Sequence, residues 1–294
     1  MQQTTLKNTV TGTRIATQAR TFILLAGLTA LLAAIGGLIG GASMLVVFLA
    51  FGVVLNFAMY WFSDRLALRM SRAQPLDEND DPELFAMVAS LARRAELPMP
   101  RLYVIPQDQP NAFATGRNPK NAAIAVTAGI RRLMPAYQLE GVLAHEFAHI
   151  KNRDILVQSV AAMIAGAISG IAQFLSFSFL FGGGDDDDNP LGIIGVLATI
   201  ILAPLAAMLI QMSISRQREY LADATGAKIL GAPDPLADAL ESLERGAEAI
   251  PMDVNPASEP LYIVNPLRGG GVAGLFATHP PIRERVARLR ALRV

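Results

Sequence analysis

The sequence contains no cysteine and only three histidines, His145, His149 and His279. Without cysteine the chain cannot form disulfides, use a thiol as a nucleophile or bind a metal through thiolate. Any metal site must therefore be built from imidazole and oxygen ligands. Any histidine chemistry must use one or more of the three.

Charged residues are also few, at 17% of the 294 residues, and their signs cancel, with 25 basic and 25 acidic side chains. The net charge gives no sign of a nucleic-acid partner, and we expect none. Hydrophobic residues make up 52% of the chain. This composition is too apolar for an ordinary soluble domain and too charged for a protein that lies entirely in the membrane.

Four long apolar stretches without formal charge account for this composition; they cover residues 21–41, 42–62, 155–181 and 191–211. Each has about the 20 residues that a helix needs to cross a bilayer. The first also fits a signal peptide, but the second follows almost at once, which favours a retained hairpin. The glycines between 36 and 41 then turn the chain, or alternatively form a helix-packing face. We expect two transmembrane hairpins, with helices at about 21–40 and 43–62, and at about 155–181 and 191–211.

Basic residues lie on one side of these four stretches. They are Lys7, Arg14, Arg20, Arg65, Arg69, Arg72, Lys151, Arg153, Arg216 and Arg218. The two turns on the opposite side carry no Lys or Arg, and one of them reads GGGDDDDNP. By the positive-inside rule, both termini and the polar segments face the cytoplasm.

The chain therefore divides into an N-terminal tail and hairpin (1–62), a polar segment (63–154), a second hairpin (155–211) and a second polar segment (212–294). Neither polar segment is large, so we expect them to fold together into one cytosolic domain. Helical patterns cover 81–97, 137–154, 213–230, 234–249 and 281–294, and short strand patterns cover 101–106, 111–116 and 122–127. The predicted fold class is α+β with four transmembrane helices.

The motif HEFAH carries the chemistry. His145 and His149 are four residues apart, so on a helix both imidazoles project from one face, about 6 Å apart along the axis, as two ligands of one metal do. Glu146 is turned by one residue and can hold a water beside the metal without binding the metal itself. Zinc with an open position lowers the pKa of its bound water, and a neighbouring carboxylate takes the proton. The motif predicts one catalytic zinc per chain.

A catalytic zinc needs a third protein ligand, and the candidates are His279 and carboxylates. Glu219 in SRQREYLAD is followed one helical turn later by Asp223, which can accept the outer N–H of a ligand histidine. An ordinary solvated helix is the alternative. Position favours Glu219: if the helices continue, it lies about 12 Å beyond the fourth apolar stretch, and His149 lies about 9 Å before the third. Both residues are therefore expected at a similar height above the membrane, on its cytoplasmic side.

These motifs resemble the HtpX family of bacterial membrane zinc metalloproteases, which are related to the CAAX prenyl proteases. The resemblance is carried by HEFAHIKNRD, SRQREYLAD, NAFATG, LYIVNPL and ATHPPIRERV and covers nearly the whole chain. It implies a gluzincin-type site with His145, His149 and Glu219 as zinc ligands and Glu146 as general base. It also implies a location in the bacterial inner membrane and proteolysis of misfolded or damaged membrane proteins, in quality control and the stress response.

The same resemblance implies three further roles. NAFATG resembles the gluzincin edge strand to which an extended substrate adds as an antiparallel strand, with Asn111, Ala112 and Phe113 as contacts; an ordinary strand is the alternative. His279 resembles a histidine that donates to the oxyanion of the tetrahedral intermediate, or else caps the last helix. Asp154 braces the site or caps the start of the third apolar stretch.

Three other functions fit the sequence less well than proteolysis of unfolded proteins. An intramembrane protease would carry its motif inside an apolar span, whereas RRLMPAYQLEGVLAHEFAHIKNRD is polar on both sides. A prenyl-peptide protease shares the chemistry, but four spans are too few for the architecture expected of it. A non-catalytic membrane scaffold would hold zinc with four protein ligands and no water.

Overall fold

The protein is described by a computed structural model, which covers residues 2–161, 216–250, 261–264 and 280–293. The fourth predicted span, most of the third and His279 lie outside the described residues.

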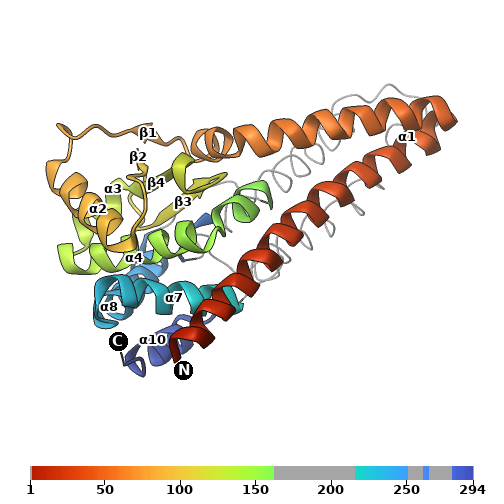
Figure 1. The fold of residues 1–294 in the computed structure, drawn as a ribbon. Coiled ribbons are helices and arrows are strands. Elements are labelled where there is room, and N and C mark those ends of the chain that lie inside the picture. The colour runs from red at the N-terminus through yellow and green to blue at the C-terminus, as the bar shows by residue number, and fades with distance from the viewer. Residues whose placement is uncertain (1, 162–215, 251–260, 265–279, 294) are drawn as a thin grey trace.

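The N-terminal part of the chain is a helical hairpin. Helix α1 (Gln2–Met70) is interrupted at Gly40 and Gly41, where Gly41 has φ 65° and ψ −152°, a conformation that glycine adopts without a Cβ penalty. The turn thus falls among the glycines to which the sequence assigned it. The two arms of α1 project away from the rest of the protein (Figure 1).

The second arm is suited to a membrane. Among the described residues, Gly40–Met70 is the one helix that is long and apolar enough to cross a bilayer, and Leu25–Ala34 is a shorter apolar helix. Large apolar side chains are exposed on the second arm, including those of Val54 and Phe57. The two arms are joined by Asn56, whose amide donates to the Leu25 carbonyl at 2.7 Å and to the Thr29 hydroxyl at 2.6 Å.

A small mixed sheet forms the base of the α+β domain. Its strands are β1 (Gln74–Pro75), β2 (Arg101–Ile105), β3 (Ala112–Gly116) and β4 (Ala122–Thr127), in the order β1-β2-β4-β3. β2 and β4 are parallel, whereas β3 is antiparallel to β4. Consequently β3 is an edge strand of the described sheet.

Both faces of the sheet are covered. Because side chains alternate along a strand, Ile124 and Val126 of β4 join a large buried cluster with the helices, while Ala123 and Ala125 join a second cluster on the other face. The second cluster contains Ala67 and Leu68 from the end of α1 and also Leu261 and Tyr262.

The large cluster includes side chains of the helices α2 (Pro82–Ala95), α4 (Ala136–Asn152), α7 (Arg216–Leu230), α8 (Asp234–Ala249) and α10 (Ile282–Arg290). A 3₁₀ turn (Pro119–Asn121) links β3 to β4, and α3 (Ala128–Leu133) links β4 to α4. α4 is the central helix, because it is buried almost continuously from Gln138 to Asn152.

The described helices and strands of the α+β domain follow the sequence patterns within a few residues, whereas α1 begins at Gln2, well before the first helix expected at about 21–40. Asp81 caps α2 by accepting a hydrogen bond from the Leu84 N–H at 3.0 Å, and Pro82 occupies the first turn as expected. The sequence did not indicate β1 or α3, since segments of two and six residues are too short to show a period.

The expectation that the helix carrying HEFAH continues into the third apolar stretch was wrong. α4 does not continue into the third apolar stretch but ends at Arg153, which adopts φ 63° and donates its N–H to the carbonyls of His149 and Ile150. A new helical segment begins at residue 155. The distance of His149 from the membrane therefore cannot be read from one straight helix.

Candidate metal centre

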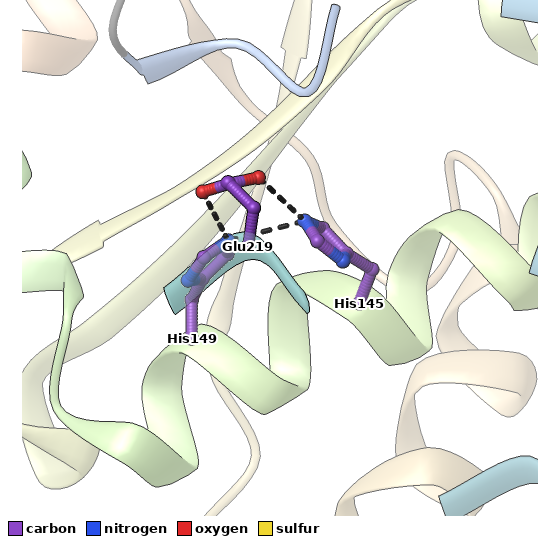
Figure 2. Close-up of side chains that lie close together, drawn as sticks. All are labelled: His145, His149 and Glu219. Carbon is purple, nitrogen blue, oxygen red and sulfur yellow. Dashed lines mark hydrogen bonds and ion pairs between the residues drawn. The ribbon is translucent and has the colours of Figure 1, made fainter. Parts of the chain in front are cut away.

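The two motif histidines and Glu219 meet inside the protein. His145 and His149 lie one turn apart on α4, and Glu219 lies in the first turn of α7, which packs alongside (Figure 2). The Nε2 atoms of the two histidines are 3.1 Å apart. The Glu219 oxygens lie 3.7 Å from Nε2 of His145 and 3.6 Å from Nε2 of His149. All three side chains are buried.

These separations fit one tetrahedral metal. Metal–ligand bonds of about 2.1 Å at tetrahedral angles place neighbouring ligand atoms roughly 3.4 Å apart. The observed separations of 3.1, 3.6 and 3.7 Å bracket that value. Two imidazoles and one carboxylate are the protein ligands of known catalytic zinc sites of the His₂Glu kind. The three residues therefore fit a metal ion.

Two aspartates orient the histidine rings. Nδ1 of His145 lies 3.0 Å from Oδ1 of Asp223, and Nδ1 of His149 lies 3.3 Å from Oδ2 of Asp154. When Nδ1 carries the proton and donates it to a carboxylate, the lone pair of Nε2 is left for a metal. The sequence analysis expected Asp223 to accept the outer N–H of a ligand histidine and named Asp154 as a residue that braces the site.

Arg285 of α10 joins the site, and the sequence analysis missed it. Its guanidinium donates to both Asp223 oxygens, at 3.0 and 2.7 Å, and its side chain is fully buried. Its Nη1 atom also lies 3.9 Å from Oε2 of Glu219. The motif ATHPPIRERV contained Arg285, but nothing in its spacing separated Arg285 from the other basic residues of an amphipathic helix.

The charges of this cluster control the protonation of its members. Burial by itself would lower the pKa of His145, but hydrogen bonds to Asp223 and Glu219 outweigh it and raise the pKa to about 9. Burial would raise the pKa of Asp223, but the charge of Arg285 and the bond to His145 lower it to about 2. Asp223 is thus held ionised beside His145. A metal must displace the proton on Nε2 of His145 when it binds.

Glu146 stands next to the metal ligands without joining them. It is buried, and its burial raises the pKa of its carboxyl, while the two histidines and a hydrogen bond from the backbone of Ala114 act in the opposite direction. The bond to Ala114 fixes Glu146 against the edge of β3. A carboxyl with a raised pKa in this position can accept a proton and return it.

The edge of β3 presents backbone groups towards this site. Asn111 accepts from the Thr127 N–H of β4 at 3.0 Å, and in an antiparallel ladder the direction alternates, so Ala112 and Ala114 face away from β4. Phe113 differs from the expectation, because its backbone faces β4 and its buried ring packs on Tyr262 with centroids 5.4 Å apart. Phe113 therefore supports the strand, and its side chain does not point towards a substrate.

Gly226 lets α7 approach α4 closely enough to bring Glu219 to the histidines. A Cβ at Gly226 would lie 3.1 Å from the backbone nitrogen of His145 and 3.2 Å from the backbone carbonyl group of Ala144. These are backbone atoms of a buried helix, so they cannot move aside easily. Sequence reasoning also missed this residue, since a glycine inside a helix has no pattern that reveals which neighbour it meets.

The fold and the site define a metalloprotease with a membrane anchor. Residues 78–293 match the model of Peptidase family M48, and the chain belongs to this family. Its relatives include a "Protease HtpX homolog" of Syntrophobacter fumaroxidans, 52% identical over 277 residues, which are 93% of this chain and 98% of the relative. Another, from Persephonella marina, is 52% identical over 274 residues, 92% of this chain and 95% of the relative. The resemblance to the HtpX family is confirmed.

A solved structure is similar in fold. The crystal structure of S. mikatae Ste24p matches with a TM-score of 0.52 at 21% identity, over 95% of this chain and 67% of that chain. At that identity the match shows the fold alone. It agrees with the α+β domain and its small sheet.

Proposed function

We propose that the protein is a zinc-dependent endopeptidase of the gluzincin type. The observation that carries the proposal is the spacing of the His145, His149 and Glu219 ligand atoms, which suits one tetrahedral ion, with Glu146 on the same helix beside them. Among the described residues this trio is the group that could hold a metal. Three protein ligands leave one position for water or substrate, as catalytic zinc sites require.

The types of ligand favour zinc as the metal of this site. Imidazole and carboxylate without thiolate suit zinc in a tetrahedral site, whereas magnesium and calcium prefer six or more oxygen ligands. When bound, zinc lowers the pKa of its water and polarises the scissile carbonyl. Asp223 and Asp154 keep the two rings in the required tautomer, and Glu146 takes the proton from the water and delivers it to the leaving amine.

We further propose that substrates are misfolded or damaged membrane proteins, bound in extended form along β3. An exposed peptide backbone can add to the outward-facing groups at Ala112, with Asn111 binding a backbone carbonyl. Recognition through backbone groups is indifferent to sequence, which suits unfolded chains of many kinds. His279 keeps its proposed role as oxyanion donor from the motif alone, because it lies outside the described residues.

The proposed location is the bacterial inner membrane, with both termini and the active site in the cytoplasm. The apolar arm of α1 supports a membrane anchor, and the placement of Lys and Arg supports the orientation. The proposal includes all four transmembrane helices expected from the sequence.

Zinc analysis combined with casein cleavage tests the function. Glu146→Gln should keep zinc and lose about 10²- to 10⁴-fold in turnover, because it removes only proton transfer. Glu219→Ala should lose both zinc and turnover. Glu248→Ala, which changes an exposed glutamate at the end of α8, should match the parent.

Undiminished cleavage by Glu146→Gln, after removal of contaminating proteases, would refute the proposal. A hydroxamate inhibitor separates the catalytic site from a structural one. It should block cleavage by occupying the open position, whereas a site closed by four protein ligands would not bind it.

A further inference from the structure

Residues 261–264 lie along the outer edge of β3, where we propose that a substrate binds. The Ile263 N–H donates to the Ala112 carbonyl at 3.2 Å, and the side-chain amide of Asn111 donates to the Val264 carbonyl at 2.9 Å. The ring of Tyr262 packs on that of Phe113, nearly perpendicular to it. The substrate edge of β3 is therefore occupied by the chain itself.

These contacts follow an antiparallel order, although residues 261–264 form a bent segment and are not a strand of the sheet. Asn111 contacts residue 264, Ala112 contacts 263 and Phe113 contacts 262, so each step forward along β3 is a step backward along the segment. The side chains alternate accordingly. Ala112 and Ile263 belong to the buried cluster on one face of the sheet, and Phe113 and Tyr262 belong to the cluster on the other.

The segment is held through groups that recognise any peptide backbone. The Ala112 carbonyl accepts from a backbone N–H, and Asn111 donates to a backbone carbonyl. Arg285 donates from Nη1 to the Ile263 carbonyl at 3.2 Å. Arg285 also contacts Asp223, and Glu146 is bonded to Ala114, two residues further along the same edge. The segment therefore lies beside the candidate catalytic groups and uses backbone contacts that an extended substrate would also use.

We propose that residues 261–264 are an internal mimic of the substrate strand, which holds the protease latent until a substrate displaces Ile263 and Val264 from β3. This inference rests on the proposed function, because it assigns a substrate to the same edge. Displacement breaks the hydrogen bonds to Ala112, Asn111 and Arg285 and uncovers the buried side chains of Ile263 and Val264. An incoming extended peptide can form equivalent hydrogen bonds and place its own side chains over the same positions.

A reversible covalent lock tests the proposal. The chain has no cysteine, so Ala112→Cys combined with Ile263→Cys creates the only possible disulfide. Hydrogen-bonded antiparallel neighbours have Cα atoms about 5.5 Å apart, within the range of about 4.4–6.8 Å that a disulfide spans. Gln74→Cys with Val104→Cys is the matched control, because it links an antiparallel pair at the opposite edge of the sheet.

We expect the oxidised lock to cleave casein at least tenfold more slowly than its reduced form, and a phosphine reductant to restore the rate. Zinc content should not change, and a small hydroxamate should still bind. The control pair should cleave equally in both redox states. Equal rates for the oxidised and reduced lock would overturn the internal-mimic proposal. Absence of zinc-dependent cleavage in the parent would instead refute the proposed function.

A second measurement needs no introduced cysteine, so it applies even if the double-cysteine variant does not fold. In zinc-loaded Glu146→Gln, a peptidyl hydroxamate that pairs with β3 should speed hydrogen exchange at the Ile263 amide at least tenfold, because its acceptor on Ala112 is taken. Acetohydroxamate, which has no strand, should leave the exchange unchanged. An unchanged or slower exchange with the peptidyl inhibitor bound would overturn the proposal.

Discussion

Single carboxylates hold the two histidine rings of the metal centre. Asp223 and Asp154 lie 3.0 and 3.3 Å from the Nδ1 atoms of His145 and His149, and Arg285 donates hydrogen bonds to Asp223 in turn. The HEFAH spacing predicted the histidines because they are neighbours on one helix. Arg285 could not be predicted in the same way, since it reaches Asp223 across 62 residues of sequence and only packing decides which side chains meet.

Replacing Asp223 with asparagine tests this support. The change keeps the size of the side chain but removes the charge that favours a proton on Nδ1 of His145. We expect zinc affinity to fall about 10- to 100-fold, as for other groups that orient metal ligands, with activity recovering when free zinc is raised. Competition with a chelator measures the affinity.

Asp238→Asn is the control for that experiment. Asp238 of α8 forms a solvent-exposed ion pair with Arg290 of α10, and such pairs contribute about 0–1 kcal/mol. Its zinc affinity should equal that of the parent. An Asp223→Asn protein with parental zinc affinity would show that Asp223 does not orient the ligand.

The elements of the site are held by the contact between α4 and α7. Both helices were predicted from their sequence patterns, and their bounds were close to those observed. Their close approach was not predicted, because it depends on Gly226 meeting the backbone of α4 at His145. A helix pattern indicates which face is apolar, but it does not show the partner or the distance.

Gly226→Ala tests the importance of that approach. Helix propensity alone would make alanine more stable by about 1 kcal/mol. A Cβ only 3.1–3.2 Å from buried backbone instead forces the helices apart, and overpacking of this kind costs about 1–3 kcal/mol. We expect a net loss of stability of about 1 kcal/mol, a lower melting temperature and weaker zinc binding.

Gly27→Ala is the matched change in α1, where a Cβ would meet nothing within 4 Å. It should raise the melting temperature slightly through helix propensity and leave the zinc content unchanged. A Gly226→Ala protein that is as stable as Gly27→Ala and binds zinc equally well would contradict the argument.

The molecule as a whole combines a helical hairpin, one arm of which is long and apolar enough to cross a membrane, with an α+β domain that carries the candidate metal centre. The end of α1 contributes Ala67 and Leu68 to the same buried cluster as Tyr262, so the hairpin is built into one face of the sheet. The candidate metal centre therefore has a defined position relative to the hairpin.

The orientation can be tested with single cysteines, because the chain has none of its own. Ser43→Cys lies at the exposed turn of the hairpin, and Glu78→Cys lies in the exposed region before α2. We expect a membrane-impermeant maleimide, once past the outer membrane, to label Ser43→Cys in intact cells and Glu78→Cys only after the cells are broken. The opposite pattern would reverse the proposed topology.

The sequence by itself determined the features that depend on neighbours along the chain. The uncharged stretches, the glycines of the α1 turn and the placement of two histidines and a glutamate on one helix all follow from local spacing and from the solvation of apolar residues. The pairing of Glu219 with that helix was also predicted, from its position after the fourth apolar stretch and from the resemblance to the HtpX family.

Only the tertiary structure decided which distant segments touch. The parallel pairing of β2 with β4, the closure of Arg285 on Asp223 and the docking of residues 261–264 on β3 each join parts of the chain that no period connects. Such contacts depend on how buried groups share space and hydrogen bonds in the folded interior. A backbone amide that pairs with a neighbouring strand carries no mark in its side chain.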